Sequence, residues 1–279
     1  MELEQLLERA HTLGDDGDWA GVAELLRDHL EEFDQEPALH CWLGVAESEL
    51  GLAGVAYESF KRALALDPTD PYILATAGSG IARFDDMDAE RALRTAALTA
   101  PEVSIARLMY GAYLAREGFV EDGIRELRAA REIDQEDPQI AYELGVAYAI
   151  AGRIDEACDA LSDAVRLDPE DGWVRTVFGL LLLESGREDE GAGELISGAR
   201  ASPQDVDAQI AAALAASAAG LDDIAYEMVE RARMLAAEGD LALVADVEER
   251  IDAGGESVTS ALREDFGPDL LRGRLQERP

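Results

Sequence analysis

Apolar residues in this chain recur with the spacing of helix faces, and many of them are small. In the stretch LGVAYAIAGRIDEA, residues 144–157, glycine or alanine stands at every second position of the first half. The large residues between them are Leu144, Val146, Tyr148 and Ile150. Large apolar residues one turn apart predict faces that pack on neighbouring helices, and only glycine or alanine lets two helix backbones cross closely. The pattern therefore predicts stacked helices whose crossings are marked by small residues.

The same pattern returns about every 34 residues. One ladder of small residues runs through Gly44, Gly78, Gly111, Gly145, Gly179 and Ala213. A second small ladder (Ala56, Ala89, Gly123, Ala157, Gly191, Ala225) and a large one (Phe60, Leu93, Leu127, Leu161, Leu195, Val229) keep the same step. One residue is missing between Gly78 and Ala89, so we expect a shortened repeat with its deletion in a short connection near FDDMDAE. Self-similarity at this period is typical of stacked helical hairpins.

Residues 37–239 resemble six tetratricopeptide repeats. The resemblance rests on WLGVAESELGLAGVAYESFKRALALDP, YELGVAYAIAGRIDEACDALSDAVRLDP and VFGLLLLESGREDEGAGELISGARASP. It implies two antiparallel helices per repeat, stacked into a right-handed superhelix whose concave surface is lined by the first helix of each pair. Helix-ending residues fit this pattern: a glycine caps the first helix (Gly118, Gly152, Gly186) and a proline stops the second (Pro68, Pro101, Pro169, Pro203). The chain departs from the pattern at Gln135 and Ala237, which replace that proline.

The predicted fold class is an all-α solenoid of about seven helix-turn-helix repeats followed by a capping helix. Extending the 34-residue register upstream predicts a degenerate N-terminal helix pair at residues 3–36. Extending it downstream predicts a capping helix at residues 240–254. The remaining tail, residues 255–279, is expected to form a short helix or to be disordered.

The acidic composition disfavours negatively charged binding partners. The chain carries 60 acidic and 24 basic residues, a net charge of −36, and its single lysine is Lys61. Such a surface repels nucleic acid phosphates and anionic lipids, so we expect neither as a partner. It resembles the acid-rich, lysine-poor surfaces of halophilic proteins, where salt screens the repulsion. No apolar run reaches 18 residues and the chain begins with acidic residues, which favours a cytoplasmic protein without a membrane span.

No motif for a catalytic or cofactor site is present. The sequence lacks GxxxxGK[ST], GxSxG, HExxH and CxxC, so we expect no enzymatic activity, no metal and no cofactor. Cys41 and Cys158 fall in helical patterns and are expected to be free, buried thiols. One alternative stays open. The three histidines, His11, His29 and His40, all lie in the first 40 residues, beside Cys41, and would support a metal-dependent regulator or enzyme if stacking brought them together.

The inner faces of the first helices are unusually free of charge. Residues spaced i, i+3, i+7 and i+10 share that face, and in the six repeats only Asp207 among them is charged, although 30% of all residues are charged. The opposite face must pack on the second helix, so these helices are apolar on both sides. Such helices are normally covered on both sides. The inner face is therefore either covered by tight stacking or serves as a binding surface.

We predict that this inner face is a groove for an apolar or amphipathic segment of another protein. The predicted contact residues are Cys41, Val45, Tyr72, Leu108, Tyr142, Val146, Trp173, Leu180, Leu183, Ile210 and Leu214, with Arg83 and Arg116 at the margin for an acidic partner residue. The best-known peptide mode of the family clamps a terminal carboxylate with lysine and asparagine. That mode is excluded, because the chain has no asparagine and Lys61 lies on a second helix.

The C-terminal tail is a candidate occupant of this groove. It carries apolar residues (Leu262, Phe266, Leu270, Leu271, Leu275) interleaved with arginines (Arg263, Arg272, Arg274), and residues 257–279 are neutral overall. A neutral, arginine-bearing segment is attracted to an acidic body. One expectation is that the tail docks on the solenoid of its own molecule or of a neighbouring one, where it competes with partners. The alternative is that the tail is a disordered end. A structural protein that self-associates through its apolar face is the alternative to an interaction scaffold.

Overall fold

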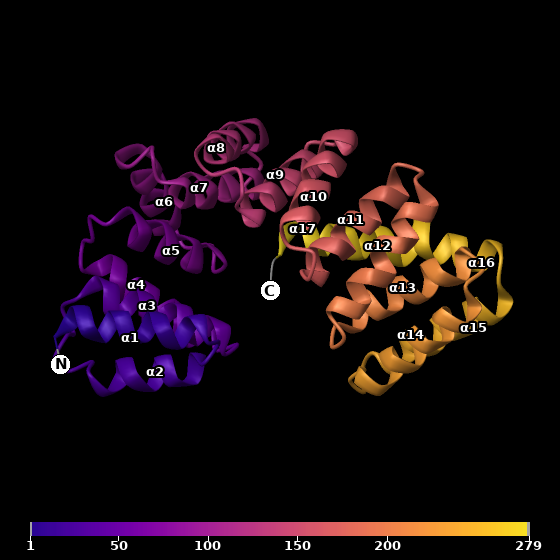
Figure 1. The fold of residues 1–279 in the computed structure, drawn as a ribbon, viewed down its shortest axis with the longest axis horizontal. Helices are drawn as coiled ribbons and strands as arrows, with labels where there is room; N and C mark the ends of the chain where they lie inside the picture. Colours follow the sequence, from indigo (N-terminus) through magenta and orange to yellow (C-terminus); the bar gives the residue numbers. More distant parts are fainter. Residues whose placement is uncertain (1, 278–279) are drawn as a thin grey trace. The chain divides into compact units, whose positions relative to one another are not determined.

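The computed structural model describes residues 2–277, and all regular structure in that range is helical (Figure 1). Successive helices pair as antiparallel hairpins, which confirms the predicted all-α repeat fold. The chain divides into two compact units, Met1–Asp134 and Gln135–Pro279, named unit 1 and unit 2 and described separately. In the described range no helix is both long and apolar enough to cross a membrane.

The helix bounds follow the 34-residue register, with one hairpin per repeat. Unit 1 contains α1 (Leu3–Asp15), α2 (Trp19–Asp28), α3 (Pro37–Glu49), α4 (Ala53–Ala65), α5 (Pro71–Ala82), α6 (Asp88–Thr99), α7 (Ser104–Arg116) and α8 (Val120–Ile133). Unit 2 contains α9 (Pro138–Ile150), α10 (Ile154–Leu167), α11 (Gly172–Glu184), α12 (Glu188–Ala201), α13 (Val206–Ala218), α14 (Asp222–Leu235) and α15 (Leu241–Ala253). The tail of unit 2 forms α16 (Glu256–Ser260), a π-helical turn (Ala261–Asp265) and α17 (Phe266–Gln276).

Helix ends form where the repeat pattern carries capping residues. Gly152 follows α9 with a φ of 71°, and the N–H of Arg153 donates to the carbonyl oxygen of Tyr148 at 2.9 Å, completing a Schellman cap. At the start of the same helix, Asp137 accepts a hydrogen bond from the N–H of Gln139 at 2.7 Å. The predicted role of the glycines that follow the first helices is therefore confirmed, because they supply the left-handed conformation that ends the helix.

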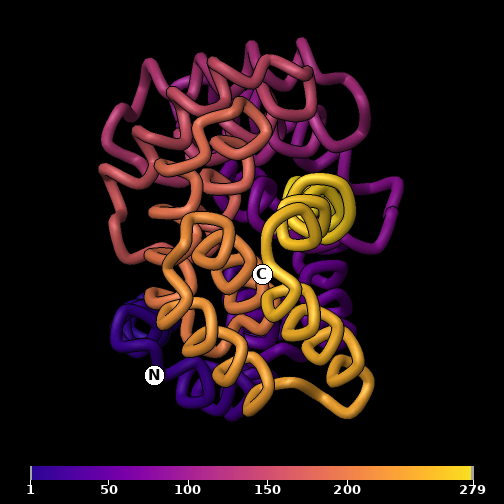
Figure 2. Tube along the Cα trace, turned by 90° about the vertical axis from the view of Figure 1, so that its right-hand side faces the viewer, coloured from indigo at the N-terminus to yellow at the C-terminus, as the bar shows by residue number. Residues whose placement is uncertain are grey.

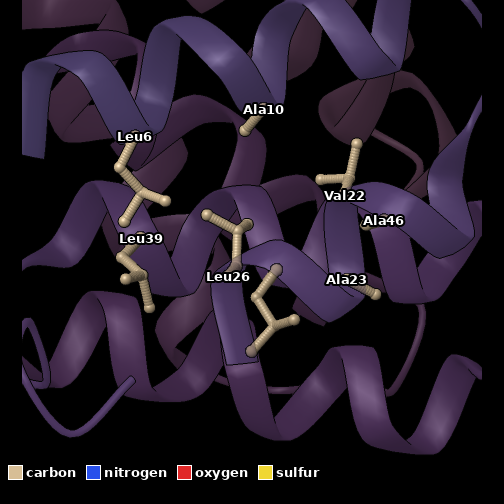
Figure 3. Packing of buried hydrophobic residues seen from close by; sticks show 8 residues of the cluster. Leu6, Ala10, Val22, Ala23, Leu26, Leu39 and Ala46 are labelled. Carbon is tan, nitrogen blue, oxygen red and sulfur yellow. The ribbon is translucent and has the colours of Figure 1, made fainter. Parts of the chain in front are cut away.

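The N-terminal hairpin packs by the same rule as the hairpins that follow it. Its core joins α1 and α2 to α3, the first helix of the next hairpin (Figure 3). The buried side chains are Leu6, Ala10, Val22, Ala23, Leu26, Leu39, Leu43 and Ala46. On each helix these residues lie three or four apart, except for the adjacent Val22 and Ala23, so each helix presents one apolar stripe to a shared core. Fully burying one such leucine stabilises the fold by roughly 1.5–3 kcal/mol.

The crossing of α11 and α12 explains the small residues of the repeat. A Cβ atom added to Gly191 would lie 2.9 Å from the backbone oxygen of Gly179, and one added to Gly179 would lie 2.8 Å from Cγ of Leu195. Both distances are shorter than van der Waals contact, so the two backbones approach this closely only because both side chains are absent. Gly193, two residues further along α12, has nothing within 4 Å of an added Cβ.

The shortened repeat differs from the expectation of a short connection. The missing residue shortens the helices instead: α5 and α6 have 12 residues each, and the connection between them runs from residue 83 to 87. Asp85 stands where the other first helices are followed by glycine, and its φ of 53° is left-handed. Aspartate adopts the left-handed conformation less readily than glycine, so the helix cap of this repeat is less favourable than the glycine caps of the other repeats.

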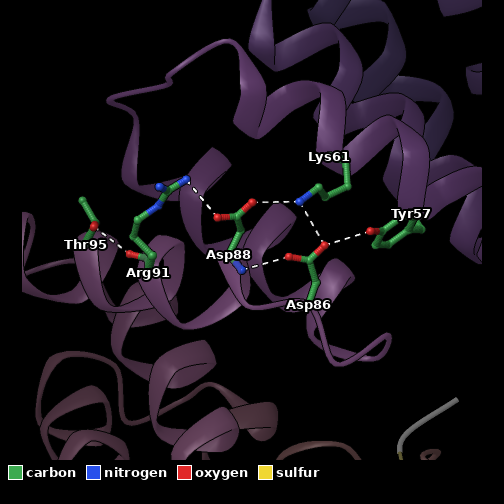
Figure 4. Close-up of polar contacts among 6 residues, drawn as sticks. All are labelled: Tyr57, Lys61, Asp86, Asp88, Arg91 and Thr95. Atoms are coloured by element: carbon green, nitrogen blue, oxygen red, sulfur yellow. Dashed lines mark hydrogen bonds and ion pairs between the residues drawn. The ribbon is translucent and has the colours of Figure 1, made fainter.

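The only lysine of the chain fastens this connection to α4 (Figure 4). Nζ of Lys61 lies 2.9 Å from Oδ2 of Asp86 and 2.8 Å from Oδ2 of Asp88. The hydroxyl of Tyr57, also on α4, donates to Asp86 at 2.8 Å. A hydrogen bond from the N–H of Asp88 and then the ammonium of Lys61 lower the pKa of Asp86 to about 2. Asp86 is therefore held as a carboxylate by contacts that exist only in the folded protein.

The C-terminal tail turns back on unit 2. α15 packs on α13 and α14, and two residues with left-handed φ, Gly254 and Gly255, lead from α15 into α16. α16 contacts α13, and α17 lies against α11 with further contacts to α13 and α9. Figure 2 shows α17 in yellow, viewed nearly along its axis.

Alanine at Gly191 and alanine at Gly193 are expected to have opposite effects. Gly191→Ala forces α11 and α12 apart and should lower the free energy of unfolding by about 1–3 kcal/mol. Gly193→Ala, on the same helix but in open space, should raise it by about 0.5–1 kcal/mol through helix propensity. Denaturant unfolding of both variants measures the difference, and equal effects would contradict the close crossing.

Acid should weaken the connection at Asp86. The pKa of Asp86 is lower in the folded protein than the ordinary value of 3.8, so its contribution to stability is present above about pH 4 and is lost as the pH falls towards 2. Asp86→Asn should lower the melting temperature at pH 7, and the difference from the wild type should shrink between pH 4 and 2. Glu102→Gln, at an exposed position in the connection between α6 and α7, serves as the control. A difference that is independent of pH would contradict the assigned role.

Candidate peptide-binding surface

Seven of the predicted groove residues lie on three neighbouring first helices of unit 2 and are named the unit 2 inner face. They are Tyr142 and Val146 of α9, Trp173, Leu180 and Leu183 of α11, and Ile210 and Leu214 of α13. All except the half-buried Trp173 are buried. These three helices are the ones that α17 contacts. The tail therefore lies along the helices that carry the predicted groove of this unit.

In unit 1, part of the predicted groove is covered by stacking. Cys41 is buried and Val45 half-buried in a core shared by α3, α4, α5 and α6. Burial raises the pKa of the Cys41 thiol to about 12, so this side chain is an unreactive part of the core. Leu108 of α7 is buried as well. For Cys41 and Val45 the covering of the inner face comes from the neighbouring helices of that core.

The other predicted residues of unit 1 do not form an apolar wall. Tyr72, at the start of α5, is 57% exposed, and Arg83, at the end of the same helix, is exposed. Arg116 is half-buried and donates to the carbonyl oxygen of Ala112 at 3.4 Å. A surface comparable to the unit 2 inner face is therefore not assembled by these side chains.

An arginine of α17 makes the central polar contact of the unit 2 inner face. Cζ of Arg274 lies 3.7 Å from the centre of the Trp173 ring, which is a cation–π geometry. Nη2 of Arg274 donates to Oδ2 of Asp205 at 2.6 Å. Nε1 of Trp173 donates to the hydroxyl of Tyr142 at 2.9 Å, which orients the indole beneath the guanidinium. Tyr142, Trp173 and Asp205 are named the arginine subsite; Arg274 is only 4% exposed in it.

The surroundings of Arg274 favour positive charge. Asp205 is the N-cap of α13 and accepts a hydrogen bond from the N–H of Ala208 at 3.0 Å. Desolvation and then the neighbouring Asp205 raise the pKa of Asp207, whereas the charge of Arg274 opposes that rise. An open pocket of about 760 Å³ is lined by residues at this end of α13 and by residues of α17. A cation bound here is compensated by carboxylates, and an anion would be repelled.

The tail is held by few buried apolar side chains. The buried ones are Val258, Ala261, Leu262 and Leu271, and the half-buried ones are Phe266, Leu270 and Leu275. α17 is also a weak helix by composition, because Gly267, Pro268 and Gly273 are among its 11 residues. Its helical structure therefore depends on docking rather than on intrinsic propensity.

The sequence pattern did not distinguish Arg274 from the other tail arginines. Arg263 pairs with Glu188, and Arg272 pairs with Asp269 inside α17; both arginines are exposed. The sequence does mark the aspartate that pairs with Arg274, because an aspartate recurs at the start of the first helices in the 34-residue register (Asp137, Asp171, Asp205). That register predicts an N-cap, but not which arginine reaches it.

The three histidines are held by separate contacts. These are His11 Nδ1 to Asp15 Oδ2 (3.0 Å), His29 Nδ1 to the carbonyl oxygen of Leu25 (3.0 Å) and His40 Nε2 to the carbonyl oxygen of Asp34 (2.9 Å). Within residues 2–277 no three His, Cys, Asp or Glu side chains are grouped so that they could hold a metal ion. The alternative of a histidine metal site therefore finds no ligand group in that range.

The period of the hairpins and their caps define an α-solenoid. The tetratricopeptide repeat family model matches residues 138–171, which include the whole hairpin of α9 and α10. Residues 138–171 are therefore a tetratricopeptide repeat, and the fold of the described chain is that of tetratricopeptide repeat proteins. Proteins of this family generally mediate protein–protein interactions, and the scaffold is typically non-catalytic.

Solved structures with this fold include the APC/C hetero-tetramer Cut9–Hcn1, with 17% identity and a TM-score of 0.70 over 87% of this chain and 48% of that one. PilF of Pseudomonas aeruginosa is 16% identical, with a TM-score of 0.59 over 76% of this chain and 97% of that one. A tetratricopeptide repeat protein of Parabacteroides merdae is 15% identical, with a TM-score of 0.59 over 88% and 97%. The chain spans about half the length of the first of these, and the likeness shows the fold alone. No curated protein sequence matches the chain.

Arg274→Ala should loosen α17 from the unit 2 inner face. The variant loses a cation–π contact worth about 0.5–2 kcal/mol and a charge-assisted hydrogen bond worth about 1.5–3 kcal/mol. We expect the backbone amides of α17 to exchange hydrogen at least about tenfold faster, since 1.4 kcal/mol is a factor of ten. Hydrogen exchange followed by mass spectrometry measures this change.

Arg272→Ala is the matched control for Arg274→Ala. Arg272 lies two residues away on the same helix, but its side chain is 73% exposed and pairs with Asp269 within α17. We expect exchange in α17 to stay within about twofold of the wild type, as for an exposed ion pair. Equal acceleration in both variants would show that Arg274 is not the anchor.

Proposed function

We propose that this protein is a non-catalytic interaction module whose unit 2 inner face binds an amphipathic helical segment of a partner protein. The observation that carries the proposal is the position of α17, an amphipathic helix that lies against α9, α11 and α13. A surface that accepts one such helix offers the same apolar area and the same acidic edge to another. Helices laid into apolar grooves are a recurring mode of peptide recognition.

The tail is suited to exchange with a partner. α17 contains two glycines and a proline, so it gains little from its own helix propensity. Gly254 and Gly255 join the tail to α15, and glycine allows the chain to change direction there. Phe266, Leu270 and Leu275 are only half-buried in the docked tail. A partner helix with stronger propensity and a larger apolar stripe would therefore displace α17.

The electrostatics favour a protein partner over a nucleic acid or an anionic membrane. The chain carries a net charge of −36, and the inner-face edge near Arg274 is lined by Asp205 and Asp207. Phosphate groups approaching this edge would be repelled. A helix that carries positive charge at one end and leucines along one face matches both features.

The proposal is tested with the chain's own tail as the probe. A fluorescent synthetic peptide of residues 256–276 is titrated into the full-length variant Arg274→Glu, whose tail is repelled from Asp205, and into the wild type. We expect the variant to bind the peptide at least about tenfold more tightly, because its internal competitor is weakened and each 1.4 kcal/mol is a factor of ten. Fluorescence anisotropy measures both affinities.

Arg272→Glu controls for the change of charge. It alters the same helix by the same charge at an exposed position, so its tail should stay docked and its affinity should match that of the wild type. Circular dichroism checks that both variants keep the helical content of the repeats, and any loss in Arg274→Glu should be no larger than that of the undocked α17. If the peptide does not bind to Arg274→Glu at all, the unit 2 inner face does not accept helices in trans.

A further inference from the structure

We infer that the arginine subsite selects the partner, and that the partner is an amphipathic helix with an arginine one turn after a leucine, as Arg274 follows Leu271. This inference rests on the proposed function and names the chemistry of the segment that is bound. The chain's own α17 is then the internal competitor, because it carries the same pair: Leu271 is 9% exposed and Arg274 is 4% exposed. Residues three apart lie on one face of a helix, so one helix face can fill both positions.

The stacking geometry favours arginine over lysine. The guanidinium carbon of Arg274 is 3.7 Å from the centre of the Trp173 ring, and a planar guanidinium makes this contact over its whole face. The hydrogen bond from Trp173 to Tyr142 fixes the ring from its edge. An ammonium group is a compact, strongly hydrated charge that would have to lose water in order to fit against the indole.

The hydrogen-bonding geometry disfavours a neutral side chain. Oδ2 of Asp205 accepts from Arg274 at 2.6 Å, while Oδ1 caps α13 through the N–H of Ala208. The Asp205 side chain is 22% exposed when the tail is docked. A helix without a donor at this position would cover a carboxylate oxygen and leave it unpaired, which is costly. The subsite therefore attracts arginine and also rejects helices that lack it.

The internal arginine is not fully satisfied. Nη1 of Arg274 is buried and has no hydrogen-bond partner within residues 2–277. An arginine in a partner helix that brings its own acceptor, such as a carboxylate one turn away, would satisfy that nitrogen and bind more tightly than α17 does. A partner helix must therefore bind the unit 2 inner face more tightly than α17 does, as is expected when the tail is an internal competitor.

The test compares four fluorescent peptides of residues 256–276 on the full-length Arg274→Glu variant. The peptides are the native sequence and the substitutions Arg274→Lys, Arg274→Gln and Leu271→Ala. We expect Arg274→Gln to weaken binding by at least about thirtyfold and Arg274→Lys by about fivefold to tenfold, in line with the loss of a desolvated cation–π contact and an ion pair. Leu271→Ala should weaken binding by about tenfold or more, in line with a truncated buried leucine.

Changes in the protein give a readout that general destabilisation would not produce. Added to Arg274→Glu, Trp173→Leu should reduce the preference for the native peptide over the Arg274→Gln peptide to less than about threefold, whereas Trp173→Phe should keep most of it, since phenylalanine still offers a ring face. The ratio of two affinities on one protein is measured, so a uniform loss of binding does not mimic the result. A preference that survives in Trp173→Leu would overturn the assignment of the subsite.

The remaining outcomes separate this inference from the proposed function. If all four peptides bind Arg274→Glu equally well, the surface binds helices but does not read arginine, so only the inference fails. If none binds, the proposed function fails and the inference with it. Sedimentation of the wild-type chain tests a second copy as the occupant. A concentration-dependent dimer that is lost in Arg274→Glu would mean that tails exchange between copies, and would overturn the choice of a separate partner helix.

Discussion

Each first helix of unit 2 is apolar on two opposite faces, and both faces need cover from water. In α11, for example, Phe178 and Leu182 are buried on one side of the helix and Leu180 on the other, while Leu183 packs against Gly191 of α12. The hydrophobic effect makes exposure of either face costly. The second helix of each hairpin packs on one face, and the two helices approach closely because glycine lies at their crossing. The other face needs a different cover, and in unit 2 the C-terminal tail supplies part of it.

The tail combines weak general attachment with one nearly buried ionic contact, that of Arg274. Its apolar residues are few and partly exposed, and its last helix contains residues that disfavour helix formation. Arg274 compensates by stacking on Trp173 and pairing with Asp205 in a nearly buried position. Apolar area gives affinity without much direction, whereas a planar cation between an indole and a carboxylate fixes the position of the helix.

Two of the basic residues, Lys61 and Arg274, form ionic contacts that connect separate segments of the chain. With 60 acidic and 24 basic residues, a basic side chain finds a carboxylate almost anywhere on the surface. Exposed pairs such as Arg272 with Asp269 contribute little to stability. Lys61 and Arg274 differ because each joins separate segments of the chain: Lys61 joins α4 to the connection after α5, and Arg274 joins the tail to the start of α13.

The sequence by itself determined the elements that depend on local spacing. The period, the hairpins and the glycine caps all follow from helix geometry, which repeats with the chain. Local spacing did not determine that the deletion would shorten α5 and α6, because helix length near Asp85 depends on the cap that the residue can form. Only the tertiary structure decided that Cys41 and Val45 lie in a core of stacked hairpins, and that Arg274 rather than Arg263 or Arg272 reaches Asp205. The direction of the tail is set by the turn at Gly254 and Gly255 and by the π-helical turn after α16, and such long-range geometry leaves no period in the sequence.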